Sequence, residues 1–211
     1  MVRRDDALVE RARGQCVIHV GCADSPLTSA RLADGTLLHP QLVHAAANVI
    51  GVDLDVDAVA VLRAAVPGDY SIGDISDPAW SAPDATMVIA ADVLEHVPDA
   101  GRFLAGLRRI AKGAPIVITT PNGLALRQVA SAGVLGVEPI HPDHRAIYTP
   151  TTLTAALRHA GLEPVEWAYY LTPGAYQGVR RAMDAVLRGV VRLRHQVADG
   201  LLVVCRDLGG E

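Results

Sequence analysis

Two short apolar runs, and the residues that end them, constrain the fold of this chain more than any other feature. The first run, 16–21, breaks into the small-residue turn 21–26 (Gly-Cys-Ala-Asp-Ser-Pro), and the second, 48–53, closes on the carboxylate of Asp53. A buried strand, a small-residue turn, a helix and a strand tipped with an acid form the pattern of a nucleoside-binding βαβ unit. We therefore predict a nucleoside site at the carboxyl ends of these two strands.

Short apolar runs alternate with helical patterns along the rest of the chain, which predicts an α/β fold. The expected strands cover 16–21, 48–53, 70–72, 85–91, 114–120, 163–170 and 201–207. The expected helices cover 5–12, 57–65, 100–111, 152–160 and 175–197. We expect a Rossmann-like, seven-stranded, mostly parallel sheet with helices on both faces and an antiparallel last strand at its edge.

The sequence predicts one domain over residues 1–211, because it contains no repeat, no low-complexity segment and no linker. Two connections, at about 27–47 and 123–148, are longer than a minimal crossover between strand and helix needs. Long connections in a compact domain are usually lids or binding loops. We interpret both as insertions at the mouth of the site.

Composition and charge disfavour several classes of protein. Net charge is −4 and the pI is near 6.0, so no basic surface for nucleic acid is expected. No run approaches the roughly 18 apolar residues that span a bilayer, and the first residues are charged, unlike a signal peptide; a cytoplasmic protein is expected. Cys16, Cys22 and Cys205 lack metal-binding spacing, and Cys16 and Cys205 are expected to be buried thiols. A homo-oligomer is compatible with all of this.

The small-residue turn decides which kind of nucleoside is expected. It does not read Gly-x-Gly-x-x-Gly, and it has no second and third glycine to approach a pyrophosphate. An NAD-dependent dehydrogenase is therefore disfavoured. A ligand without phosphates, such as S-adenosylmethionine, needs only small residues and a few backbone donors.

Six segments, in order along the chain, resemble motifs of the class I S-adenosylmethionine-dependent methyltransferases. They are 17–25, 51–53, 73–75, 90–98 (Ala-Ala-Asp-Val-Leu-Glu-His-Val-Pro), 116–122 and 152–163. The segment 90–98 is the most specific match, and it is similar to the small-molecule branch of the family. The resemblance covers most of the chain and implies S-adenosylmethionine as the cofactor that donates the methyl group.

The resemblance also implies roles for single residues: Asp53 for the ribose, Asp74 for the adenine amino group, and the turn at Asp92 for the methionine portion. The expected cofactor-binding residues are His19, Gly21, Ala23, Asp53, Leu54, Gly73, Asp74, Ile75, Ala91, Asp92 and His96. Other interpretations stay open: each of the three acids can instead cap a turn or a helix. His96 can pack beneath its turn.

Two departures from the family pattern affect the cofactor site. His19 stands where the family usually has an acid that helps to hold the methionine amino group, so Asp24 or a water would have to substitute. Ala23 and Ser25 replace glycines. His19 can also be a core histidine without a ligand role. A non-catalytic cofactor-binding or scaffold module is therefore an alternative function.

The segment 141–144 (His-Pro-Asp-His) supplies a general base for methyl transfer to a hydroxyl. Methyl transfer depends mainly on positioning, and a base adds about 10²–10⁴-fold when the nucleophile is a protonated hydroxyl. We assign His144 as the base, His141 as the second candidate, and Asp143 as the residue that orients an imidazole. Branches of the family that methylate sugars look similar here, so a sugar or oligosaccharide is the expected small-molecule acceptor. The alternative is that these histidines only cap loops.

Other residues are weaker candidates. A Mg²⁺ ion is an option, held by Asp92, Asp143 and His144 with help from Glu95 and His141. Polar substrate contacts are expected from Arg31, His39 and His44, with a solvated lid as the alternative. Pocket walls are expected from Tyr148, Tyr169 and Tyr170, although Tyr169 or Tyr170 is expected to pack in the core instead. The helix expected over 175–195 has an arginine face that is either solvated or a docking face for an anionic substrate, an acidic partner or a membrane. Its arginines are Arg180, Arg181, Arg188, Arg192 and Arg194.

Overall fold

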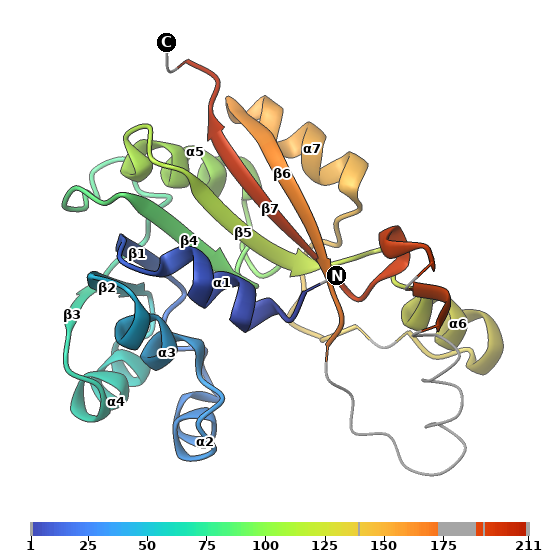
Figure 1. Ribbon diagram of the computed structural model, residues 1–211, viewed down its shortest axis with the longest axis horizontal. Coiled ribbons are helices and arrows are strands. Elements are labelled where there is room, and N and C mark those ends of the chain that lie inside the picture. The colour runs from blue at the N-terminus through green and yellow to red at the C-terminus, as the bar shows by residue number, and fades with distance from the viewer. Residues whose placement is uncertain (1, 139, 173–188, 192, 210–211) are drawn as a thin grey trace.

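A seven-stranded sheet forms the centre of the molecule in this computed structural model, which describes residues 2–138, 140–172, 189–191 and 193–209 (Figure 1). The strand order is β3-β2-β1-β4-β5-β7-β6. The strands are β1 (Cys16–Val20), β2 (Asn48–Asp53), β3 (Asp69–Ile72), β4 (Met87–Ala91), β5 (Ile116–Pro121), β6 (Leu162–Tyr170) and β7 (Gly200–Asp207). All seven expected strands are present, with ends that differ by at most two residues.

The sheet is mostly parallel and its last strand is antiparallel, which confirms the predicted fold class. β1 to β5 pair in parallel, whereas β7 pairs antiparallel with both β5 and β6. The predicted position of β7 at the edge is wrong, because β7 lies between β5 and β6. Its residues explain this position: Leu201, Leu202 and Val203 are consecutive and fully buried, as expected for a strand that is covered on both faces.

Helices cover both faces of the sheet. The helices are α1 (Arg4–Ala12), α2 (Thr28–Ala33), α3 (Leu38–Ala45), α4 (Val56–Ala65), α5 (Ala100–Ala111), α6 (Leu126–Leu135) and α7 (Pro150–His159). One core packs α1 and α3 against the sheet, and a second core packs α5 and α7 against the opposite face. Successive side chains of β1 point into different cores: Val17 lies in the first core and Ile18 in the second. Side chains of a strand alternate between its two faces in this way.

Capping residues fix where the helices begin beside the sheet. The Asp99 side chain accepts a hydrogen bond from the Arg102 backbone N–H at the start of α5. α7 begins with a capping box in which Thr149 and Thr152 bond each other's backbone N–H, followed by Pro150 in the first turn. These arrangements satisfy N–H groups that have no partner within the helix.

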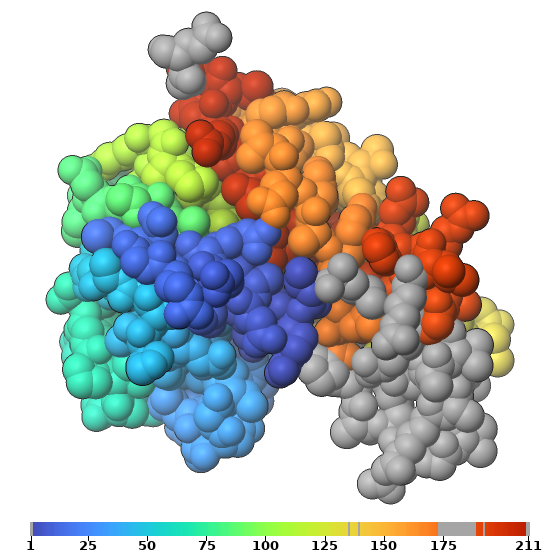
Figure 2. Space-filling view, in the orientation of Figure 1, coloured from blue at the N-terminus to red at the C-terminus, as the bar shows by residue number. Residues whose placement is uncertain are grey.

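The segment 27–47, expected to be an insertion at the mouth of the site, contains two helices, α2 and α3. Leu38 and Leu42 of α3 are buried against Leu8 of α1, so α3 is part of the core. Pro40 made this helix difficult to predict, because proline usually breaks a helix. Pro40 stands in the first turn of α3, however, where a residue without an N–H loses no intrahelical hydrogen bond. Figure 2 shows the residues of α1 and of this segment adjoining on one face of the molecule.

Three further expectations concern the cysteines, the arginine-rich helix and membrane-spanning segments. Cys16 is exposed, contrary to the prediction, because it is the first residue of β1; Cys22 and Cys205 are buried, and burial raises the pKa of each thiol to about 12. Most of the arginine-rich range 175–195 lies outside the described residues, and Arg194 is exposed. In the described part of the chain, no helix is long and apolar enough to cross a membrane.

Candidate active site

A cavity of about 630 Å³ opens at the carboxyl ends of β1, β2, β4 and β5. Ligands of open α/β sheets bind at this edge, and the volume lies within the range of about 300–1,000 Å³ that is usual for small-molecule sites. Its lining includes nine of the predicted site residues, namely His19, Gly21, Asp53, Ala91, Asp92, His96, His141, Asp143 and His144. The fold therefore brings predicted cofactor-binding residues and the predicted base segment 141–144 into one cavity.

The turn after β1 needs its glycine. Gly21 has φ +74°, and a Cβ at this position would clash with Cγ2 of Val93. The Gly21 N–H donates to the Val52 carbonyl at 2.8 Å, which ties the turn to the end of β2. The backbone of the turn at Gly21 therefore lines the cavity with no side chain between it and a bound ligand.

Asp53 is held by backbone donors at the end of β2. Its Oδ2 accepts a hydrogen bond from the Ala23 N–H at 2.9 Å, and its Oδ1 accepts one from the Asp55 N–H at 3.1 Å. A carboxylate oxygen can accept two hydrogen bonds. Each oxygen therefore keeps an acceptor position for a ligand hydroxyl, which fits the ribose role implied by the resemblance.

Asp92 is the centre of an ionic network at the end of β4. It pairs with the guanidinium of Arg4, and its Oδ1 accepts hydrogen bonds from the hydroxyls of Thr119 at 2.7 Å and Tyr170 at 3.0 Å. Its backbone is left-handed, with φ +53°, a conformation that persists only where the surroundings enforce it. Burial and the nearby Asp92 carboxylate raise the pKa of Tyr170. Asp92 is thus presented to the cavity as a fixed carboxylate.

The three histidines of the mouth lie together. The ring of His144 lies 4.7 Å from that of His96 and 5.7 Å from that of His141, measured between centroids. Burial and then the two neighbouring imidazoles lower the pKa of His144, which keeps it neutral and able to accept a proton near pH 7. Nδ1 of His141 instead accepts the Asp143 backbone N–H at 3.3 Å, and it lies 3.6 Å from the Asp143 carboxylate.

Glu95 is a buried residue that anchors the backbone next to this cluster. It is 1% exposed, and its carbonyl oxygen accepts the backbone N–H groups of Arg145 and Ala146, which fixes the segment after His144. Its Oε2 accepts a hydrogen bond from Thr120 at 3.1 Å, whereas its buried Oε1 has no partner among the described residues. Burial, followed by the charge of Asp92, raises the pKa of Glu95 to about 8.

A metal ion would find a different ligand set from the predicted one. One ligand atom each from Glu95, His96 and His144 lie within 4.8 Å of one another, and neither Asp92 nor Asp143 belongs to this group. Two imidazoles and one carboxylate suit Mn²⁺, Fe²⁺ or Zn²⁺. They do not suit Mg²⁺, which prefers oxygen ligands.

Five predicted cofactor residues do not line the cavity: Ala23, Leu54, Gly73, Asp74 and Ile75. The Asp74 Oδ1 accepts the Ser76 N–H at 2.8 Å, as in the turn-capping interpretation, while Ile75 is buried and Leu54 is 66% exposed. At Gly73 a Cβ would clash with the Trp80 ring. The cofactor contacts predicted for these five residues stay predictions, including the adenine contact of Asp74.

The weaker candidates separate into three environments. Arg31 lines the cavity and pairs with Asp24. His39 is fully buried and His44 is exposed away from the cavity, so neither is placed for the predicted substrate contact. The predicted wall residues Tyr148 and Tyr170 are buried in the core.

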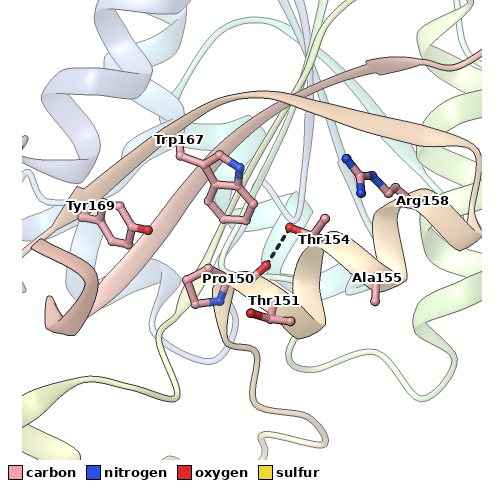
Figure 3. A pocket seen from close by; sticks show the side chains of 7 residues that line it. All are labelled: Pro150, Thr151, Thr154, Ala155, Arg158, Trp167 and Tyr169. Carbon is pink, nitrogen blue, oxygen red and sulfur yellow. Dashed lines mark hydrogen bonds between the residues drawn. The ribbon is translucent and has the colours of Figure 1, made fainter.

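A second cavity of about 470 Å³ lies between α7 and β6, and it shares no lining residue with the first. Figure 3 shows Trp167 and Tyr169 of β6 beside the first turns of α7, where the Thr154 hydroxyl donates to the Pro150 carbonyl at 2.7 Å. Tyr169 thus lines this cavity rather than the mouth of the first.

Arg4 is the main charged residue of the cavity lining that the sequence patterns do not reveal. It is eighty-eight positions from its partner Asp92, and nothing in its neighbourhood resembles a motif. Only the packing of α1 beside β1 brings it to the cavity. Leu37, Leu38, Val93 and Pro121 also line the cavity as apolar wall residues.

Comparisons with known proteins agree with this geometry. The sequence profile described as a methyltransferase domain matches residues 4–166. A probable S-adenosylmethionine-dependent methyltransferase of Mycolicibacterium smegmatis is 27% identical over 91% of this chain and 68% of its own length. The ubiquinone biosynthesis O-methyltransferase of Azorhizobium caulinodans is 33% identical over 68% of this chain and 62% of its own.

Solved structures share the fold at low sequence identity. A putative methyltransferase of Bacillus halodurans C-125 superimposes with a TM-score of 0.63 at 14% identity, covering 96% of this chain and 98% of its own. The magnesium protoporphyrin IX methyltransferase of Synechocystis PCC 6803, with S-adenosylhomocysteine bound, gives a TM-score of 0.55 at 15% identity, covering 96% of this chain and 81% of its own.

Proposed function

We propose, from the premise that this chain belongs to the class I S-adenosylmethionine-dependent methyltransferases, that it methylates a hydroxyl group of a small polar metabolite. The family membership rests on the profile that matches residues 4–166. The transfer to oxygen is supported by relatives named as O-methyltransferases. The observation that carries the proposal is the position of the His144 imidazole in the lining of the cavity that Asp53 and Asp92 also line, where burial lowers its pKa.

The cofactor supplies an electrophilic methyl group, which the acceptor oxygen takes as the carbon–sulfur bond breaks and its electron pair stays on sulfur. The chain's own contribution is to position the reactants and to remove one proton. Gly21, Asp53 and Asp92 offer the cofactor a close backbone and two fixed carboxylates. Such positioning can contribute about 7–11 kcal/mol to lowering the barrier.

We assign to His144 the removal of the proton from the acceptor hydroxyl. Its ring has no hydrogen bond among the described residues, and its lowered pKa keeps a lone pair available near pH 7. His141 is the weaker candidate, because its Nδ1 already accepts the Asp143 N–H. In its neutral form, His141 therefore carries its hydrogen on Nε2 and presents a donor to the mouth.

The acceptor class follows from the polar groups at the mouth. Arg31 with its partner Asp24, together with His141 and Asp143, surrounds the opening with donors and acceptors. No tryptophan, phenylalanine or tyrosine lines this cavity among the described residues, so a flat aromatic acceptor would find only imidazole and guanidinium planes to stack on. A sugar or oligosaccharide is the acceptor class that we propose.

The test is a screen of monosaccharides and oligosaccharides for methylated products by mass spectrometry, with the wild type and three variants. We expect His144→Gln to lower kcat by about 10²–10⁴-fold and to leave S-adenosylhomocysteine binding unchanged. The control is His159→Gln, because His159 is exposed on α7 and does not line the cavity. A larger loss in His141→Gln than in His144→Gln would contradict the assignment of the base.

A bound divalent ion is a second version of this function, favoured by the unpartnered buried Oε1 of Glu95 beside His96 and His144. These three residues would hold the ion, which would lower the pKa of the acceptor hydroxyl in place of a free base. Activity that disappears with a chelator, and returns with Mn²⁺ or Zn²⁺ but not with Mg²⁺, would support the ion. Activity that a chelator leaves unchanged would rule it out in favour of the free imidazole.

A further inference from the structure

A stacked pair of histidines, of which His19 lines the cavity and His39 lies behind it, has no part in the function proposed above. His19 of β1 is 2% exposed and pairs in register with Gly51 of β2. His39 of α3 is fully buried, and the two rings stack with centroids 5.3 Å apart and planes 10° apart. Gly51 leaves room for the pair, because a Cβ there would lie 2.9 Å from Cε1 of His39.

The pair shares one hydrogen bond. The two Nδ1 atoms are 3.1 Å apart, so one of them donates and the other accepts. Burial lowers the pKa of His39 to about 4, and burial, His39 and Arg4 hold the pKa of His19 well below its usual value. Both rings are therefore neutral near pH 7, and each carries a single ring hydrogen.

The surroundings of His39 decide where these hydrogens lie. Its Nε2 is buried and has no hydrogen-bond partner among the described residues. A buried N–H without an acceptor is rarer than a buried acceptor without a donor, and it costs about 1–3 kcal/mol. His39 thus carries its hydrogen on Nδ1 and donates it to Nδ1 of His19. His19 must then carry its own hydrogen on Nε2, the ring nitrogen left for the cavity that this residue lines.

We propose that His19, held in its Nε2–H form by His39, donates a hydrogen bond to the carboxylate of the cofactor's methionyl group, with Arg4 as a second donor. Both residues line the same cavity. An N–H donor at this strand position suits the carboxylate of an amino acid, whereas an acid there would suit its ammonium group. The fixed carboxylate of Asp92 remains as the acceptor for the ammonium.

At the end of β1 this chain would therefore offer a donor to the cofactor's carboxylate, whereas the family resemblance implies an acid that accepts from the cofactor's ammonium group. His19 is a cofactor-binding residue in this account, and His39 is a positioning residue that acts through it. The inference rests on the cofactor alone and is independent of the acceptor and of the base.

The experiment compares S-adenosylmethionine with decarboxylated S-adenosylmethionine, which keeps the ammonium and the sulfonium but lacks the carboxylate. Calorimetry gives the Kd of each ligand without any acceptor. We expect His19→Leu to weaken S-adenosylmethionine about tenfold or more, as for a lost hydrogen bond to a charged group, and to change the decarboxylated ligand less than about twofold. His19→Gln, whose amide N–H replaces Nε2–H, should stay within about threefold of the wild type for both ligands.

Three outcomes would overturn the proposal: tighter binding of S-adenosylmethionine by His19→Glu, an equal loss of both ligands in His19→Leu, or no binding of either ligand to the wild type. The role of His39 has its own pair of variants. His39→Asn keeps a donor in place of Nδ1–H and should retain affinity, whereas His39→Leu should weaken S-adenosylmethionine selectively. Equal weakening of both ligands by His39→Leu would show a merely structural role, and circular dichroism checks that each variant is folded.

Discussion

The buried imidazole of His39 makes stability depend on pH at the scale of a single residue. Burial lowers its pKa from 6.5 to about 4 in the folded state, so the unfolded chain binds the proton more readily. The stabilisation is fully present above pH 6.5 and is lost as the pH falls from 6.5 through 4, by about 3 kcal/mol. In urea unfolding at pH 7.5, 6 and 5, His39→Asn should show a weaker dependence than the wild type, because only the contribution of His19, whose pKa burial also lowers, remains. The exposed control His44→Asn should keep the wild-type slope, and parallel slopes in wild type and His39→Asn would contradict the burial argument.

Gly21 gives a second prediction at this scale. Alanine at φ +74° costs about 1–2 kcal/mol in backbone strain, and its Cβ would also clash with Val93 at the cavity wall. Gly21→Ala should therefore lower stability and abolish S-adenosylhomocysteine binding measured by calorimetry. Gly113→Ala is the matched control, because Gly113 has φ +90° but open space around it and lies outside the cavity. Binding that survives in Gly21→Ala would mean that the close backbone approach is not needed.

At the scale of elements, α3 is predicted to be structural rather than part of a movable lid. Leu42 is fully buried in the core between α1, α3 and the sheet. Leu42→Ala should lower the free energy of unfolding by about 2–5 kcal/mol, measured by urea denaturation. His44→Ala, on the exposed side of the same helix, should change it by less than about 0.5 kcal/mol. A negligible effect of Leu42→Ala would show that α3 packs loosely.

The elements also show what the sequence can and cannot predict. Strand β4 is a continuous apolar run and β5 begins with one, so both are recognisable from residue type, because both of their faces are buried. The helix α3 escaped prediction because Pro40 and the short length obscured its period. The order of β6 and β7 depends on long-range pairing that no local pattern encodes. For the same reason, Arg4 of α1 could not be assigned to the cavity from sequence.

At the scale of the whole molecule, the parallel sheet explains why so much of the site was predictable. Residues that follow β1, β2 and β4 must meet at one edge, so Gly21, Asp53 and Asp92 line one cavity. The residues predicted from the turn after β3, Gly73 and Asp74, lie beside the cavity lining rather than in it, where Trp80 packs against Gly73. The histidines of 141–144 reach the same cavity because Glu95 holds the backbone that follows them.

The central claim is that this cavity binds S-adenosylmethionine and its product through Asp53. The most direct measurement is a calorimetric titration of the purified protein with S-adenosylhomocysteine, in parallel with Asp53→Ala and with NAD⁺ as the competing nucleoside ligand. We predict one micromolar site per chain for S-adenosylhomocysteine, loss of that site in Asp53→Ala, and no binding of NAD⁺. Unchanged affinity in Asp53→Ala, or binding of NAD⁺ in place of S-adenosylhomocysteine, would contradict it.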